Sequence, residues 1–437
     1  MKTNDHPVFR ARTDRRLLTD RGGVRHILVD VTAPEITRPD DAERPPLDLA
    51  LVIDASGSMS GPSLEAARQA ATGVVAAMGP HDRITVISFA DDVQTHVASL
   101  PIADQGRTTA TRAIAKLTTR GCTDLCGGWQ AGVTTLTDHA RDGAQRRVVV
   151  LSDGHANRGV VDPEQLGLEA AAALAKGVAT TCVGIGEHYS TTQLAALCEH
   201  GGGNLHHAAR PEEIVEVVCG ELGQILTTVV EGVALELNVP SGVSAEAVGP
   251  FPTRERSDGP AIELGGLTSG ATRRVVVRLR CPEGVSGDRL SVLITPTWRR
   301  PGADEVIRAE TLAIELLYAP VEEVATECPD IQVCLEIAET WQRDMIRQAS
   351  VMVEEGDREG AAGFVDEMRG ELEDYLRDLP GGEEILERLQ WFRMRLDRSM
   401  TIRLAKEVSS CMYQLSRSTP DLREHHSFKM EDIDRLD

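Results

Sequence analysis

The sequence predicts a doubly wound, Rossmann-like α/β domain with a mostly parallel sheet, inserted into a small antiparallel β-sandwich and followed by an α-helical C-terminal domain. Three observations predict this order. Apolar strand-like runs alternate with amphipathic helical stretches from residue 47 to about residue 224, which is typical of a parallel sheet with helices on both faces. After residue 226 apolar residues recur at every second position, and from about residue 331 they recur at helical spacing.

The α/β domain is expected over residues 46–224. Its first strand, LDLALVIDAS, is an almost continuous apolar run, as expected for a parallel strand that is buried on both faces. The next segment, PSLEAARQAATGVVAAM, has apolar residues at helical spacing. The following expected strands are RITVISFA, RRVVVLSDG and GVATTCVGIG, with amphipathic helices between them. This alternation predicts the doubly wound sheet.

The β-sandwich is expected to come from two segments, residues 12–45 and 225–319. In the second segment, period-two alternation marks several strands separated by turns rich in Gly and Pro, which is typical of antiparallel sheets. One strand, in VRHILVDVTAP around Ile27, precedes the α/β domain and has no obvious partner strand in its own segment. Because unpaired backbone groups are costly, we expect this strand to join the sandwich. The α/β domain is then an insertion.

Residues 320–418 are expected to form a helical bundle or hairpin of two or three antiparallel helices. Their apolar stripes are Cys334, Ile337, Trp341, Met345, Ala349 and Met352, then Phe364, Met368, Leu372 and Tyr375, then Leu389, Phe392 and Leu396. Residues 319–437 carry 28 Asp and Glu against 15 Lys and Arg. This charge predicts a solvated helical surface, with an acidic partner-binding module as the alternative. We expect the acidic tail, residues 419–437, to be disordered.

Composition and charge exclude several classes of protein. The net charge of −22 disfavours nucleic-acid binding, because a polyanion needs a basic face. No run of 18 apolar residues occurs, so a membrane span is not expected, and the charged segment MKTNDHPVFRARTDRR stands where a secretory signal needs an apolar stretch. Nine irregularly spaced cysteines predict neither a disulfide framework nor a zinc site. We therefore expect a cytoplasmic protein.

The residues that carry chemistry follow the apolar strands. Asp54, Ser56 and Ser58 lie in DASGSMS, at the end of the first strand. Thr123 lies in RGCTDLCGG, and Asp153 in VVVLSDGHAN follows another apolar strand. The carboxyl ends of parallel strands share one edge of an open α/β sheet, where ligands bind. Carboxylate and hydroxyl oxygens suit Mg²⁺ or Ca²⁺, whereas a zinc site favours Cys and His.

This D-x-S-x-S loop, with a separate threonine and a later aspartate, resembles the metal-ion-dependent adhesion site of von Willebrand factor A domains. The segments VISFADDV, LSDGHANRGV, VGIGEHYSTTQLAALCEHGGGNLHHA and PEEIVEVVCGEL also resemble that family, so the resemblance covers the whole predicted α/β domain. It implies that Ser56 and Ser58 bind the metal directly, and that Asp54, Thr123 and Asp153 bind it directly or through water. The flanking regions resemble bacterial, intracellular members related to inter-alpha-trypsin-inhibitor heavy chains and calcium-activated chloride channel regulators.

The resemblance implies a binding protein and not an enzyme. We expect one divalent cation, Mg²⁺ in the first place and Ca²⁺ or Mn²⁺ as alternatives. These ligands leave at least one coordination position, which suits a Glu or Asp carboxylate from a partner protein. Arg120, His155 and Arg158 are candidates for the partner-binding rim, with ordinary loop positions as the alternative. The resemblance also implies an adaptor in an intracellular assembly, with an AAA+ ATPase or another multi-protein assembly as partner.

Two other interpretations of this loop stay open. GSMSG fits the G-x-S-x-G elbow of serine hydrolases, in which Ser60 would be the nucleophile. Little more than one strand precedes the motif and no HGGG-like segment is present, which favours the metal interpretation. The second alternative is a loop that holds no metal and satisfies its hydroxyls internally. Two carboxylates that meet without a cation would repel each other, which again favours a metal.

Overall fold

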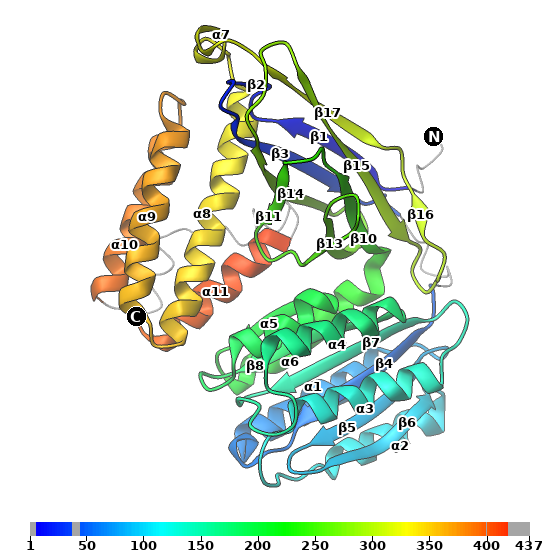
Figure 1. Ribbon diagram of the computed structural model, residues 1–437. Coiled ribbons are helices and arrows are strands. Elements are labelled where there is room, and N and C mark those ends of the chain that lie inside the picture. Colours follow the sequence, from blue (N-terminus) through cyan, green and yellow to red (C-terminus); the bar gives the residue numbers. More distant parts are fainter. Residues whose placement is uncertain (1–5, 37–43, 399, 418–437) are drawn as a thin grey trace. The chain divides into compact units, whose positions relative to one another are not determined.

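The structure, a computed structural model, divides into two compact parts (Figure 1). It describes residues 6–36, 44–398 and 400–417. One part, the α/β domain, comprises residues 37–231 and 299–305, and the other comprises residues 1–36, 232–298 and 306–437. The α/β domain is therefore inserted into the chain of the other part, as predicted.

One mostly parallel sheet forms the centre of the α/β domain. Its elements are β4 (Leu47–Asp54), α1 (Pro62–Ala77), β5 (Arg83–Phe89), β6 (Val93–Pro101), α2 (Asp104–Ala115), α3 (Leu125–Asp138), β7 (Gln145–Ser152), α4 (Pro163–Ala175), β8 (Val178–Ile185), α5 (Thr191–His200), β9 (Gly202–Ala208) and α6 (Pro211–Thr227). The strand order is β6-β5-β4-β7-β8-β9. All neighbours are parallel except the antiparallel pair β5 and β6. Strand β4 lies in the interior of the sheet and is buried at every position, which explains its continuous apolar run.

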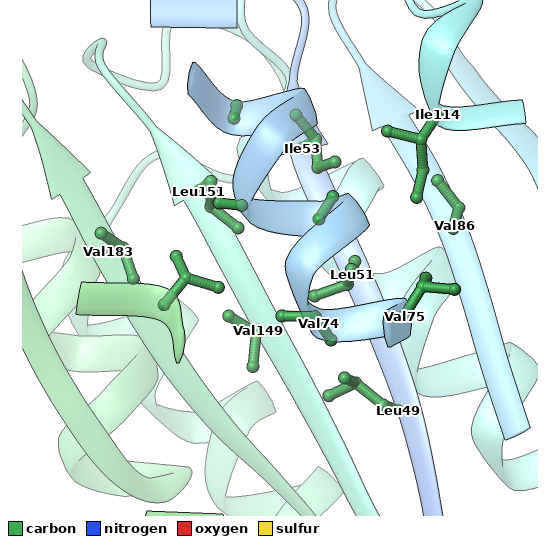
Figure 2. Close-up of a cluster of buried hydrophobic side chains, with 14 of the residues drawn as sticks. Leu49, Leu51, Ile53, Val74, Val75, Val86, Ile114, Val149, Leu151 and Val183 are labelled. Carbon is green, nitrogen blue, oxygen red and sulfur yellow. The ribbon is translucent and has the colours of Figure 1, made fainter. Parts of the chain in front are cut away.

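Helices cover both faces of this sheet (Figure 1). On one face, α1, α2 and α6 share an apolar cluster with alternate side chains of β4, and Figure 2 shows Leu51 of β4 packed with Val74 of α1. On the other face α3 approaches β4 closely, because a β-carbon on Gly132 would lie only 2.9 Å from Val52 Cγ2. Glycine at this position lets the helix reach the sheet. The doubly wound fold is confirmed, and in such a fold ligands bind outside the carboxyl ends of the strands.

The second part contains a β-sandwich. Its strands are β1 (Val8–Thr13), β2 (Leu17–Leu18), β3 (Gly23–Thr32), β10 (Thr228–Asn238), β11 (Ser244–Val248), β12 (Thr253–Arg254), β13 (Ala261–Thr268), β14 (Thr272–Cys281), β15 (Arg289–Arg299), β16 (Ile307–Arg308) and β17 (Leu312–Tyr318). One sheet has the order β1-β3-β14-β11, and the other has the order β12-β13-β10-β15-β17-β2, with β16 beside β15. Strands from before and after the α/β domain thus share both sheets, which explains how one sandwich carries an insertion.

The N-terminal strand differs from its prediction. Ile27 of β3 pairs with Thr13 of β1 on one side and with Val277 of β14 on the other. Strand β3 is therefore an interior strand, and the expectation that it lacks a partner in its own segment is wrong. The segment also begins at Val8, before the expected residue 12. The sequence of β1, VFRART, hides the strand because it lies at the sheet edge and none of its residues is fully buried.

Helices follow the sandwich in the same compact part (Figure 1, yellow to red). They are α7 (Val321–Ala325), α8 (Ile331–Glu354), α9 (Arg358–Leu376), α10 (Gly382–Arg398) and α11 (Ile402–Arg417). Helix α11 is not among the two or three predicted helices, although Leu404, Val408 and Met412 form its buried face at helical spacing. Within the described ranges no helix is long and apolar enough to cross a membrane. The predicted disordered tail, residues 419–437, lies outside the described residues.

The helices pack on the sheet that contains β3. Leu28 of β3 and Val276 of β14 belong to the same apolar cluster as Ile337 and Met345 of α8. Helix α8 begins where the Asp330 carboxylate accepts a hydrogen bond from the backbone N–H of Val333, at 3.1 Å. Its amphipathic face therefore gains stability from burial against the sheet.

Candidate metal centre

Asp54 is the last residue of β4, at the carboxyl edge of the sheet, and its side chain is fully buried. One carboxylate oxygen, Oδ1, accepts the backbone N–H of Ser56 at 2.8 Å. The other, Oδ2, accepts the hydroxyl of Ser152 at 2.6 Å. The strand end and these two hydrogen bonds fix the orientation of the carboxylate.

The two serines of the D-x-S-x-S loop connect Asp54 to Asp153. The hydroxyls of Ser56 and Ser58 are 2.9 Å apart, and Ser58 donates to Asp153 Oδ1 at 2.7 Å. Because the Ser58 proton is directed at Asp153, Ser56 is the donor between the serines. The chain turns here through a short 3-10 helix, Gly57–Met59, which brings both hydroxyls to the same side.

Thr123 reaches the same place from the loop before α3. Its backbone N–H donates to Asn157 Oδ1 at 3.1 Å, and the N–H of Asn157 donates to the Thr123 carbonyl at 3.2 Å. A β-carbon placed on Gly154 would lie 3.5 Å from Thr123 Oγ1 and 3.7 Å from Ser58 Oγ. The hydroxyls of Thr123 and Ser58 therefore lie against the same glycine, next to Asp153.

Burial makes this carboxylate pair electrostatically unfavourable on its own. It raises the pKa of Asp54 to about 6; hydrogen bonds from Ser152 and Ser56 oppose the rise, and the charge of Asp153 adds to it. Burial also raises the pKa of Asp153, against the hydrogen bond from Ser58. The nearby arginines, Arg120 and Arg158, pair with other carboxylates. A divalent cation would balance both charges.

The donor set fits a hard cation. Two carboxylates and three hydroxyls are oxygen ligands of the kind that Mg²⁺ and Ca²⁺ prefer. In the part of the chain that the structure describes, no three His, Cys, Asp or Glu side chains lie together as possible metal ligands. A site of this composition contains only two such side chains, so its other donors must be hydroxyls, water or a partner.

The predicted rim residues lie on the loops around these ligands. The Arg120 guanidinium is turned to the loop after β5, where Nε donates to Asp92 Oδ1 at 2.8 Å. The Arg158 guanidinium donates from Nη1 to Asp91 Oδ1 at 3.2 Å. His155 is exposed. Both arginines thus already have acidic partners within the domain, and their role toward an external carboxylate stays a prediction.

Ser60, the alternative nucleophile, is exposed at the end of the 3-10 helix. Its backbone N–H donates to the Gly57 carbonyl at 3.2 Å. Among the described residues no histidine or carboxylate hydrogen-bonds the Ser60 hydroxyl. A serine nucleophile needs such a base to activate it, so the geometry does not favour a hydrolase.

Sequence reasoning missed the residues that orient the ligands. Ser152, which bonds Asp54, ends β7, and Asp91 follows the end of β5, so both lie at the predicted sheet edge. Asp91 Oδ1 accepts the backbone N–H of Cys122 at 2.9 Å, and this hydrogen bond is the main cause of its lowered pKa. Their positions at the end of one apolar strand and just after another were the available signal.

Residues 48–218 match the family of the von Willebrand factor type A domain. These residues are a von Willebrand factor type A domain. The match confirms the resemblance carried by the D-x-S-x-S loop. Domains of this family, called VWA domains below, are in general protein-interaction modules.

Two relatives and one solved structure are similar to parts of this chain. The sequence is 22% identical over 298 residues to the E3 ubiquitin-protein ligase WAV3 of Arabidopsis thaliana, covering 66% of this chain and 37% of that protein. It is 31% identical over 127 residues to the inter-alpha-trypsin inhibitor heavy chain H3 of Pongo abelii, covering 28% of this chain and 14% of that protein. The chain thus spans well under half the length of either relative.

The solved structure shows that the fold similarity extends beyond the VWA domain. The von Willebrand factor type A protein from Catenulispora acidiphila has a TM-score of 0.67 to this chain at 17% identity. The similarity covers 89% of this chain and 91% of that one. Because this span exceeds the VWA domain, the sandwich and helices belong to the shared fold.

Proposed function

We propose that the VWA domain binds one divalent cation, Mg²⁺ in the first place, and captures a Glu or Asp carboxylate of a partner protein there. The convergence of Asp54, Ser56, Ser58, Thr123 and Asp153 at one sheet edge carries this proposal. The general role of VWA domains in protein interaction supports it.

Each residue has a distinct part in this proposal. Ser56, Ser58 and Thr123 would supply neutral oxygens, and Asp54 and Asp153 would supply negative charge directly or through water. When bound, the cation would supply a positive centre with an open position for an oxyanion. Ser152 and the Ser56 N–H keep Asp54 oriented, since each donates to a different carboxylate oxygen. Without the cation, an incoming carboxylate would meet two acidic side chains and be repelled.

Calorimetric titration of the full chain with Mg²⁺, Mn²⁺ and Ca²⁺ tests the proposal. We expect binding of about one ion, and a higher melting temperature with excess ion, because a ligand that binds only the folded state stabilises it. Asp54→Asn should weaken binding about 100-fold, equivalent to about 2.7 kcal/mol, because it removes a formal charge beside the cation. If none of the three ions binds at millimolar concentration, the proposal is wrong.

We further propose that the output is reversible binding and not catalysis, with Ser60 outside the site. An adaptor role in a cytoplasmic assembly, with an AAA+ ATPase or another multi-protein complex as partner, belongs to the same proposal. It predicts that partner capture from the native host's extract is lost with EDTA and restored with Mg²⁺. Capture that is unchanged by EDTA would contradict a metal-mediated contact.

A further inference from the structure

Asp91 connects the loops that carry the candidate metal ligands. Its Oδ1 accepts the backbone N–H of Cys122 at 2.9 Å, next to Thr123 in the chain. The same oxygen accepts Arg158 Nη1 at 3.2 Å, and the Asp91 carbonyl accepts that nitrogen at 3.3 Å. Arg158 belongs to the loop that begins with Asp153. One side chain therefore joins the loops that carry Thr123 and Asp153.

Packing extends this connection to the D-x-S-x-S loop. A β-carbon on Gly121 would lie only 1.5 Å from Asp91 Oδ2, so the carboxylate occupies the space that any larger residue needs. The Gly121 carbonyl in turn accepts the backbone N–H of Gly57 at 3.1 Å. Gly57 lies between Ser56 and Ser58, so Asp91 supports the loops of all three hydroxyl ligands.

We propose that Asp91 is a positioning residue of the metal centre, whose carboxylate holds the 121–123 segment so that Thr123 reaches the cation. This inference rests on the proposed function. Arg158 contributes a second contact, because its hydrogen bond connects Asp91 to the loop that follows β7. Asp91 itself does not bind the metal; it acts through the backbone that carries the ligands, as outer partners of metal ligands do.

Asp92 is a matched control on the same loop. Its carboxylate bonds the side chains of Arg120 and Gln94, at 2.8 and 2.7 Å. Its side chain is about as exposed as that of Asp91, 54% against 47%. Replacing either aspartate removes one negative charge near the site, but only the Asp91 carboxylate holds a backbone N–H beside Thr123. A comparison of the two separates positioning from a general charge effect.

The test is Mn²⁺ and Mg²⁺ titration of the full chain, with melting in EDTA as a second measurement. Asp91→Ala should raise the Kd about 10-fold, the loss expected when an outer partner is removed. Asp91→Asn should lose less, since its amide oxygen still accepts the Cys122 N–H. Asp92→Asn should stay within about twofold of the wild type. The metal-free melting temperature of Asp91→Ala should stay close to that of the wild type.

Gly121→Ala provides an independent test of the role of Asp91. Its methyl group should displace the Asp91 carboxylate and weaken metal binding, and the Gly121→Ala/Asp91→Ala double variant should bind no more weakly than Asp91→Ala alone. A wild-type Kd for Asp91→Ala would overturn this inference and leave the proposed function standing. An equal loss for Asp92→Asn, or a fall in metal-free melting temperature that matches the loss of binding, would also overturn it. A wild type that binds no metal would overturn both.

Discussion

Two buried aspartates, one in each compact part, have opposite electrostatic surroundings. Asp54 at the sheet edge of the VWA domain has hydroxyl and backbone partners, and burial raises its pKa to about 6. Asp14 in the other part lies beside His26, whose Nδ1 is 3.1 Å from Asp14 Oδ2. Tyr375 of α9 donates to the same oxygen at 3.2 Å. Burial alone would raise the pKa of Asp14, but these His26 contacts outweigh it and lower the pKa.

The difference separates structural carboxylates from candidate ligand sites. Asp14 accepts hydrogen bonds from a strand, a loop and a helix of its own part. Its negative charge is therefore stabilised by contacts within the fold. Asp54 keeps a charge that no described cationic side chain pairs. A buried charge without a partner lowers the stability of the fold, and a ligand that supplies the missing positive charge removes this penalty.

The largest expected effect is on the stability of the part that contains Asp14. Asp14→Ala should lower its free energy of unfolding by about 3 kcal/mol, since it breaks a buried, hydrogen-bonded pair. Urea unfolding followed by tryptophan fluorescence measures this, because the Trp341 ring lies beside the rings of His26 and Tyr375. Asp54→Asn is the counterpart and should not lower the stability without metal, because it removes a buried charge that the fold retains at a cost. If Asp54→Asn costs as much as Asp14→Ala, the comparison fails.

A smaller effect concerns pH. The pKa of Asp14 is lowered below its ordinary value of 3.8. Its charged form therefore contributes stability that is fully present above about pH 4 and is lost as the pH falls through the lowered pKa. The difference in unfolding free energy between wild type and Asp14→Asn should shrink as the pH falls from 5 to 3. A difference that grows on acidification would contradict the assigned direction.

The smallest effects distinguish the serines beside Asp54. Ser58→Ala should raise the metal Kd about fivefold, because water can replace one hydroxyl in the coordination shell. Ser60→Ala should stay within about twofold of the wild type and leave partner capture intact. Calorimetric titration of both variants with Mg²⁺ measures the two Kd values. Equal losses of metal affinity in the two variants would show that the loop as a whole, and not the Ser58 hydroxyl, determines metal binding. An esterase activity that is lost in Ser60→Ala would support the hydrolase interpretation.

Local patterns in the sequence already determine much of this protein. The apolar run of β4 predicts a strand buried on both faces, and Asp54, its last residue, lies at the carboxyl edge of the sheet for topological reasons. The helical stripe of α8 predicts its buried face, from Cys334 to Ala349. These features depend on neighbours in the chain, so periodicity reports them.

The pairings between segments far apart in the sequence follow from the tertiary structure. Strand β3 precedes the inserted domain in the sequence and pairs with β14, which follows it. Tyr375 donates a hydrogen bond to Asp14, 361 residues away in the sequence. Arg120 and Arg158, the predicted rim residues, pair with Asp92 and Asp91 on the loop after β5, and these pairings could not be read from the sequence. Charge and hydrogen-bonding capacity are visible in a sequence, but the choice among many possible partners follows from which loops the fold brings together.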